Sequence, residues 1–332
     1  MTTAPIVLPP NVIPRFYRGG PAIEALRGIA LDGARVPEEW IGSTTTAFGE
    51  APLGLSRLPD GELLRDAVAA DPEGWLGPAH AARFGADPAL LVKLLDAGER
   101  LPVHVHPDGP FARAHLDVAY GKTEAWIVVD AQPGAQVHVG FREDVALGAL
   151  RGWVDAQDHD ALLGALHPVD VVAGDAIFVP AGVAHAIGEG VLIVELQEPT
   201  DLSVLLEWDG FGIADDDEAT LGLGWDLAIA CVQLTARDAQ ALRGPAPDGA
   251  LSELLPADAR AFFRAHRIAP GGATTPLGQG FAVIVVLEGE GSIGGVAVRR
   301  GDAVLVPHGA GEVAAAGALV AVSCRPPEAG PT

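Results

Sequence analysis

Two pairs of similar segments recur along the chain, and this repetition constrains the fold more than any other feature of the sequence. "AGDAIFVPAG" at 173–182 matches "RGDAVLVPHG" at 300–309, and "EAWIVV" at 124–129 matches "FAVIVV" at 281–286. In both copies the IVV segment precedes the GDA segment, and self-similarity of this kind indicates duplicated structural units. Each segment is short, apolar and bounded by turn residues, which is typical of β-strands. The sequence therefore predicts two related all-β units.

We expect the first domain to span residues 1–215 and the second to span 216–332. The acidic run "ADDDEA" lies at their boundary and is predicted to be a solvated loop. Residues 60–90 and 143–166 carry helix start and stop signals and are predicted to be helical segments of the first domain. The 42 glycines and 27 prolines of the chain suit many short strands joined by tight turns.

Three longer segments of the first domain predict individual strands. "ALLVKLLDAGERLPVHVHPD" predicts two strands and a turn, and "EAWIVVDAQPGAQVHVGF" predicts two strands that pair as a hairpin. "GDAIFVPAGVAHAIGEGVLIVELQ" predicts three short strands separated by glycine-rich turns. The fold class that follows is mainly β with helical insertions.

Bulk composition limits the classes of function and location. The net charge of −23 argues against a nucleic-acid partner, because phosphate backbones are bound by basic surfaces. Cys231 and Cys324 are too few for a disulfide framework. The chain shows no signal-peptide pattern and no apolar run near the roughly 20 residues that span a bilayer. We therefore expect a cytoplasmic protein with a small-molecule partner and no membrane contact; the oligomeric state stays open.

A histidine pair in "PVHVHPD" suggests a metal site. His104 and His106 point to the same face of a strand, because strand side chains alternate. Such a pair alone is more often a solvated strand face than a ligand pair. Comparison of the two repeats favours a ligand pair, because the second copy lacks the polar groups of the first. Phe281 stands where the first copy has Glu124, and a glutamate stands where it has His185.

Three histidines and one glutamate from neighbouring strands form a plausible ligand shell inside a β-barrel. Imidazole and carboxylate donors suit zinc, manganese, iron, cobalt or nickel, so the ligand types do not select one metal. The predicted ligands are His104, His106, Glu124 and His185.

Three further polar residues occur in apolar strand segments near this site. Lys122 lies two residues before Glu124 and is expected to face the same pocket. Glu195 of "VLIVELQ" is a candidate acid or base, because a carboxylate among aliphatic residues is costly unless it is paired or used; the alternative is an outward-facing Glu195. Lys93 of "LLVKLLDA" likewise needs a partner or an anion.

The order His-x-His, then Glu, then Pro-x-Gly-x-x-His resembles the cupin superfamily. Over roughly residues 15–210 the chain resembles more closely the class I mannose-6-phosphate isomerases, also called phosphomannose isomerases. The resemblance rests on "LLVKLLDAGERLPVHVHPD", "GKTEAWIVVDAQPGAQVHVGF" and "GDAIFVPAGVAHAIGEGVLIVELQEPTD", which occur in the family's order. It implies two cupin-type jelly-roll barrels, of which the second is degenerate and free of metal.

The resemblance also implies a reaction and the residues that perform it. In the family a single zinc is held by Gln-x-His, by the Glu of Lys-Thr-Glu and by a later His. The implied activity is the aldose–ketose isomerisation of mannose 6-phosphate and fructose 6-phosphate through a cis-enediol. Glu195 and Lys122 are the candidate catalytic residues, whereas Lys93 and Ser43 of "WIGSTTT" are candidates for holding the phosphate.

The sequence departs from the family pattern at three places. His104 replaces the family's Gln, Leu205 replaces an active-site Arg, and Arg18 replaces the Trp of Trp-Gly-Gly. Arg18 could supply a positive charge lost elsewhere. Leu205 favours an alternative function, because it lacks the guanidinium of the Arg that it replaces. That alternative is an isomerase or epimerase that acts on another sugar, phosphorylated or not. The same metal ligands also suit a metal-dependent oxygenase-like cupin or a non-catalytic sugar-binding protein.

Overall fold

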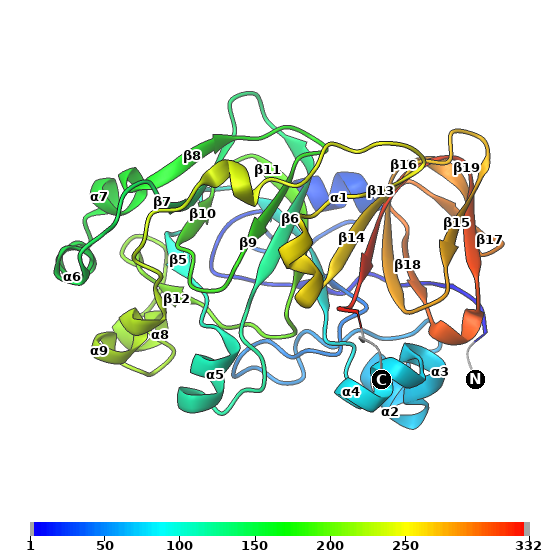
Figure 1. Cartoon of the computed structure of the whole chain (residues 1–332), viewed down its shortest axis with the longest axis horizontal. Coiled ribbons are helices and arrows are strands. Elements are labelled where there is room, and N and C mark those ends of the chain that lie inside the picture. The colour runs from blue at the N-terminus through cyan, green and yellow to red at the C-terminus, as the bar shows by residue number, and fades with distance from the viewer. Residues whose placement is uncertain (1–2, 329–332) are drawn as a thin grey trace.

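The structure, a computed structural model, describes residues 3–328, and within this range the strands form three antiparallel sheets (Figure 1). One of them is central in the molecule and contains the first copy of each of the two repeated segments. Its strands, in spatial order, are β2 (Val12–Ile13), β3 (Glu38–Ile41), β4 (Leu91–Ala97), β11 (Val191–Gln197), β6 (Glu124–Ala131) and β9 (Ala176–Val179).

The second sheet packs against one face of the central sheet. Its strands, in spatial order, are β12 (Val204–Leu205), β5 (His104–Val105), β10 (His185–Ile187), β7 (Gln136–Phe141) and β8 (Leu166–Asp170). Trp126 and Ile193 of the central sheet share one buried cluster with Val137 and Ile187 of the second. The two sheets are thus held face to face by apolar side chains, as in a jelly-roll sandwich.

The predicted hairpin between β6 and β7 is wrong, although both strands exist. β6 pairs with β11 and β9, whereas β7 pairs with β10 and β8. The chain crosses from one sheet to the opposite sheet through the turn at 132–135. Both arrangements place the alternating apolar residues in the interior, so the sequence pattern alone could not distinguish them.

The third sheet covers the other face of the central sheet. Its strands are β1 (Ile6–Val7), β18 (Ala303–Val306), β16 (Ala282–Ile293), β19 (Val313–Arg325), β14 (Arg264–Ile268) and β13 (Leu251–Glu253), with β15 (Thr274–Gly278) on β19 and β17 (Val296–Arg299) on β16. Val194 and Phe178 share a buried cluster with Leu305 and Phe263. Because the central sheet is buried on both faces, β4 and β11 are buried along their whole length.

The repeated segments occupy equivalent places in two sheets. β6 pairs antiparallel with β9 in the central sheet, and β16 pairs antiparallel with β18 in the third. β1, from the chain's N-terminal end, joins a sheet otherwise formed by residues 251–325 within the described range. The fold is mainly β, while the proposed division into domains 1–215 and 216–332 stays a proposal.

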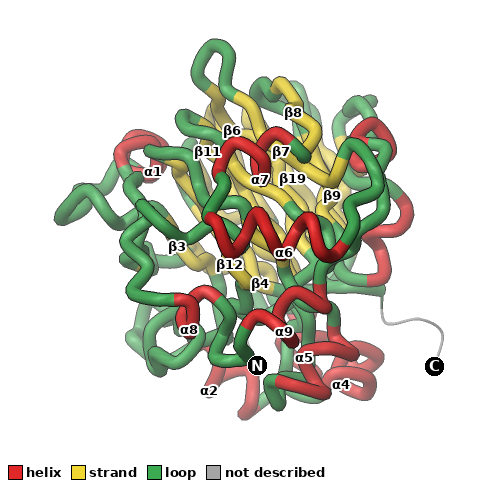
Figure 2. The backbone as a smooth tube through the Cα atoms, turned by 90° about the vertical axis from the view of Figure 1, so that its left-hand side faces the viewer, coloured by secondary structure: helices red, strands yellow, loops and turns green. Residues whose placement is uncertain are grey.

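Helices surround the sheets. They are α1 (Pro21–Arg27), α2 (Leu64–Ala70), α3 (Pro72–Leu76), α4 (Pro78–Phe84), α5 (Gly109–His115), α6 (Leu147–Ala156), α7 (His159–Gly164), α8 (Asp216–Ala219) and α9 (Trp225–Ala228). The helical prediction for 60–90 is confirmed by α2, α3 and α4, and the prediction for 143–166 is confirmed by α6 and α7. Helices α6 and α7 lie on the side of the molecule that faces the viewer in Figure 2. The acidic run forms the short helix α8, capped by Asp215, rather than a loop. No helix within residues 3–328 is long and apolar enough to cross a membrane.

Candidate metal and active site

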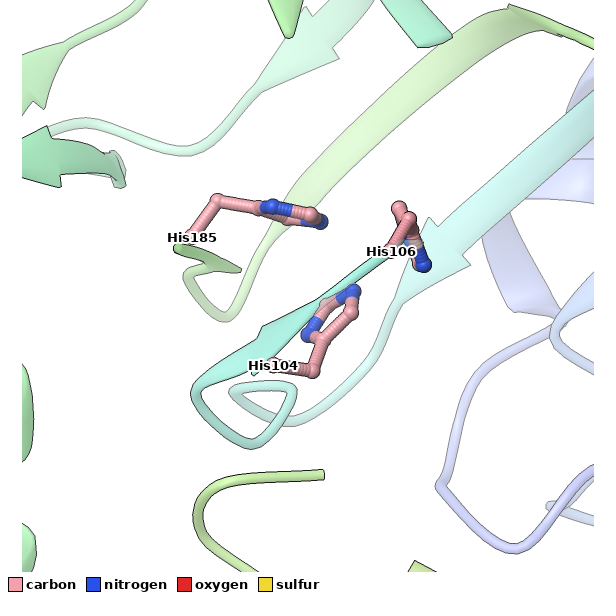
Figure 3. Close-up of side chains that lie close together, drawn as sticks. All are labelled: His104, His106 and His185. Atoms are coloured by element: carbon pink, nitrogen blue, oxygen red, sulfur yellow. The ribbon is translucent and has the colours of Figure 1, made fainter. Parts of the chain in front are cut away.

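Three buried histidines meet between the central and second sheets. His104 begins β5, His106 follows the end of that strand, and His185 begins β10, where it is the register partner of His104. One ring nitrogen of each lies within 4.8 Å of the others, and Figure 3 shows the rings gathered around one point. The alternation of side chains along the strand brings His104 and His106 to the same side, as the sequence predicts.

A backbone carbonyl fixes the orientation of each ring. Nδ1 of His104 donates to Pro102 O at 2.8 Å, Nδ1 of His106 donates to Leu202 O at 2.7 Å, and Nδ1 of His185 donates to Val183 O at 2.8 Å. Because a carbonyl only accepts, each Nδ1 carries the hydrogen and each Nε2 keeps its lone pair. This tautomer leaves the Nε2 lone pair able to bind a metal.

Glu124 completes the site from the start of β6. Its Oε2 lies 3.0 Å from His106 Nε2 and its Oε1 lies 3.3 Å from His185 Nε2. Trp126 Nε1 donates to Glu124 Oε1 at 2.9 Å and so orients the carboxylate. Within residues 3–328, His185 Nε2 is buried without a hydrogen-bond partner, whereas the buried Glu124 Oε2 has the Lys122 ammonium beside it at 3.0 Å. The lone pairs of His185 Nε2 and of the Glu124 carboxylate converge, and a cation between them would satisfy both.

The electrostatics of this cluster favour metal-binding protonation states. Burial and, next, the neighbouring His185 hold the pKa of His104 well below its ordinary value, while burial and Lys122 lower the pKa of His106 to about 3. Burial alone would raise the pKa of Glu124, but Lys122 and the histidines outweigh it and hold that pKa well below its usual range. Neutral imidazoles and an ionised carboxylate fit a divalent metal, and the cluster can hold one.

A cavity of about 410 Å³ lies beside the cluster. It brings together five of the eight residues predicted for the site. They are His104, Lys122, Glu124, Lys93 and Glu195. Leu205 also lines the cavity, as an apolar side chain where the family resemblance places an Arg. Glu218 of α8 contributes to the lining, so the acidic boundary segment is part of this cavity.

Lys122 and Glu195 are neighbours in the lining of the cavity, next to the cluster. Lys122 Nζ lies 3.0 Å from both His106 Nε2 and Glu124 Oε2, and 3.8 Å from Glu195 Oε1. Glu195 Oε2 is buried and has no hydrogen-bond partner in the described part of the chain. Burial, together with the Glu124 carboxylate, raises the pKa of Glu195 to about 8. Glu195 is therefore inward-facing, as the sequence predicts, and the alternative of an outward-facing side chain is wrong.

A second group of charges lines the cavity, and of its four members the sequence predicted only Lys93. Glu38 accepts from Tyr17 Oη and Trp40 Nε1, each at 2.7 Å, and lies 3.0 Å from Arg15 Nε and 3.5 Å from Lys93 Nζ. Burial would raise the pKa of Glu38, but Arg15 and Lys93 hold it well below its usual range. The sequence signal that could have indicated Glu38 is the pair of glutamates in "EEWI", because two carboxylates next to apolar residues of a strand need partners. The structure shows that this strand is buried throughout.

Asp201 joins this group from the loop after β11. It forms an ion pair with Arg15 and lies 3.9 Å from Lys93 Nζ. Lys93 thus has two carboxylate neighbours, which explains how its ammonium can be buried. The two positively charged side chains differ in exposure, which is 18% for Arg15 and 2% for Lys93.

The structure does not bring Ser43 or Arg18 to this cavity. The Ser43 hydroxyl is buried within its own turn, where it accepts from Thr45 N at 3.1 Å and lies at the same distance from Thr45 O. It does so because β3 ends just before it and the chain reverses. The Arg18 side chain is 66% exposed and lies near Glu99. Arg15, three residues earlier, supplies the guanidinium in the cavity instead.

Comparisons with known proteins identify similar chains. No family model matches the sequence. The chain is 29% identical over 323 residues to the mannose-6-phosphate isomerase ManA of Bacillus subtilis, a match covering 94% of this chain and 96% of the relative. It is 36% identical over 172 residues to the mannose-6-phosphate isomerase of Streptococcus mutans, where the match spans 51% of this chain and about half, 51%, of the relative.

Solved structures with the same fold agree with these relatives. The mannose 6-phosphate isomerase from Bacillus subtilis superimposes with a TM-score of 0.79 at 21% identity, over 97% of this chain and 99% of the other. The apo enzyme from Salmonella typhimurium superimposes with a TM-score of 0.77 at 18% identity, over 98% of this chain and 100% of the other. By near full-length sequence match and by fold, this chain is similar to the mannose-6-phosphate isomerases.

Proposed function

We propose that this protein is a metal-dependent aldose–ketose isomerase that interconverts mannose 6-phosphate and fructose 6-phosphate. The observation that carries the proposal is the convergence of three buried histidine rings and the Glu124 carboxylate, with His185 Nε2 unpartnered among the described residues, beside a cavity that also holds Glu195 and Lys122. The names of the Bacillus and Streptococcus relatives support it, and nothing in the comparisons favours an epimerase, an oxygenase or a non-catalytic binding protein. A cytoplasmic location, expected from the sequence, stays part of this proposal.

We propose that His104, His106, Glu124 and His185 hold the metal. Zinc is our first choice, and manganese, iron, cobalt and nickel also suit these donors. When bound, a divalent metal would polarise the hydroxyl and carbonyl oxygens of an open-chain sugar. The carbonyl partners of the three Nδ1 atoms would keep the rings in place, as such partners do in metal sites generally.

Glu195 is the proposed base that moves a proton between C1 and C2. Its unpartnered Oε2 faces the cavity from β11, next to the ligand cluster. General acid–base catalysis needs such a group within hydrogen-bond reach of the substrate carbon's proton. Lys122 would offset the repulsion between the Glu195 and Glu124 carboxylates. It would also donate a hydrogen bond to a sugar oxygen as negative charge develops on that oxygen.

For the phosphate group we propose Arg15 rather than Ser43. Arg15 uses Nε toward Glu38 and Nη2 toward Asp201, so its Nη1 group stays available for an oxyanion. Lys93 lies behind it, almost fully buried, and would add positive charge without touching solvent. Arginine suits this task because its planar fork matches phosphate geometry.

The test is conversion of mannose 6-phosphate to fructose 6-phosphate by purified protein whose metal content has been measured. We expect activity to disappear on chelation, to return on metal addition, and to be lost in Glu124→Gln. Glu288→Gln, an exposed glutamate on β16, is the matched control and should keep full activity. Full activity in Glu124→Gln, or in protein verified as metal-free, would contradict the proposal.

A further inference from the structure

Two arginines oppose each other in the third sheet. Arg264 of β14 and Arg325 of β19 are register partners, and two residues along the same face His266 partners Ser323. Like charges directly opposite on a sheet destabilise it. The alternate residues Ala265 and Cys324 point into the buried core instead. The face that carries the arginines therefore needs a negative partner.

Carboxylates of the protein compensate this pair only weakly. Arg325 donates to the carbonyl oxygens of Leu277 at 2.8 Å and Gln279 at 3.5 Å, and forms no ion pair within residues 3–328. Arg264 Nη1 lies 3.7 Å from Glu328, whose side chain is 63% exposed. Solvent-exposed pairs of this length contribute little. The weak pairing of these two arginines is unexpected, because the chain has 44 acidic and only 21 basic residues and so offers many carboxylates as partners.

Glu253, another carboxylate on this sheet, is already paired with Arg260. It lies opposite His266 on β13, but both of its oxygens accept from Arg260, at 2.8 and 2.6 Å. It therefore cannot neutralise Arg264 without giving up that bidentate pair.

A small cavity of about 200 Å³ lies over the arginine pair. Arg325, 7% exposed, and Ser323, 2% exposed, both line it. The Ser323 hydroxyl is buried and has no hydrogen-bond partner among the residues described. A buried hydroxyl without a partner costs stability unless a ligand or water satisfies it.

We propose that this cavity is a binding site for a small oxyanion, an inorganic phosphate or the phosphate or carboxylate group of a metabolite. The two guanidinium groups supply charge-assisted hydrogen bonds and Ser323 supplies a neutral donor. Burial and, next, Arg264 lower the pKa of Arg325 to about 10, so the side chain is still a cation at neutral pH. The cavity is lined by residues 251–325, whereas the cavity beside the histidines is lined by residues 14–221. The site is thus separate from the proposed active site and independent of its function.

Isothermal titration calorimetry of the full chain tests the proposal. Inorganic phosphate and acetate are titrated separately in chloride buffer of matched ionic strength, which distinguishes a phosphate from a carboxylate ligand. Arg264→Gln removes one guanidinium from a half-buried position and should weaken binding of the preferred anion by about tenfold or more. Arg299→Gln, an exposed arginine on β17, changes the net charge equally and should leave binding unchanged.

Ser323→Ala provides a second variant with a minimal change of volume, and should weaken the same binding severalfold. Arg325 itself is a poorer target because it also supports the Leu277 carbonyl. Absence of saturable binding of either anion to the unaltered protein would overturn the proposal. Equal affinity in the unaltered protein, Arg264→Gln and Ser323→Ala would overturn it too, because the anion would then bind elsewhere, for instance beside Arg15.

Discussion

Replacement of Glu38 by Ala should destabilise the protein strongly, although Glu38 is not a predicted metal ligand or catalytic base. The Glu38 side chain is 5% exposed and accepts two short hydrogen bonds, from Tyr17 and Trp40. Its loss leaves Lys93, 2% exposed, with Asp201 at 3.9 Å as its remaining ion-pair partner in the described structure. Removing one partner of a buried ion pair typically costs about 3–5 kcal/mol. We expect a loss of this size in the free energy of unfolding.

Urea denaturation at pH 7, with the metal content held constant, measures this loss. Glu38→Gln retains an acceptor oxygen for Tyr17 or Trp40 and should cost less, about 1–3 kcal/mol. Glu288→Gln, at an exposed position on β16, should change the free energy of unfolding by no more than about 0.5 kcal/mol. If Glu38→Ala were as stable as this control, the assignment of a buried, stabilising charge network would be refuted.

The pH dependence of the same free energy provides a further check. The pKa of Glu38 is lower in the folded protein than its ordinary value of 4.5, so its stabilising contribution is fully present above that value. The contribution is lost as the pH falls, because the unfolded chain then binds a proton that the folded chain does not. The stability difference between the unaltered protein and Glu38→Gln should therefore shrink between about pH 5 and pH 3.

Three further outcomes follow from the site. Glu195→Gln should lower kcat by a factor of about 10² to 10⁴ while the metal content, measured by elemental analysis, stays unchanged. Arg15→Gln should raise KM for the phosphorylated sugar by about tenfold, whereas Ser43→Ala should leave KM unchanged; the opposite pattern in steady-state kinetics would restore Ser43 as the phosphate contact. Chelation should lower the Tm, and metal addition should raise it in a concentration-dependent manner, because the metal binds the folded state. An identical Tm with and without metal would contradict a ligand cluster held in the folded protein.

The cluster of three histidines and Glu124 could be predicted because strand alternation and the comparison of the repeated segments are both visible in the sequence. Alternation places His104 and His106 on one face, and the degenerate second repeat singles out Glu124 and His185. The strand segments β4, β9 and β11 and the helices around 64–84 and 147–164 likewise follow from local signals. Each of these features depends on residues that are close in sequence, or on a comparison between two copies of one segment.

Only the tertiary structure decided which strands pair and which charges meet. β6 and β7 satisfy the same alternating pattern as a hairpin or in opposite sheets, and packing of Trp126 against Val137 across the interior selects the second arrangement. Arg15 and Asp201 are 186 residues apart, so no local spacing could reveal their ion pair. The same holds for Arg264 and Arg325, which become neighbours only through the register of β14 with β19. Local sequence determines which way a side chain points, whereas the side chain that it meets depends on long-range strand pairing and burial.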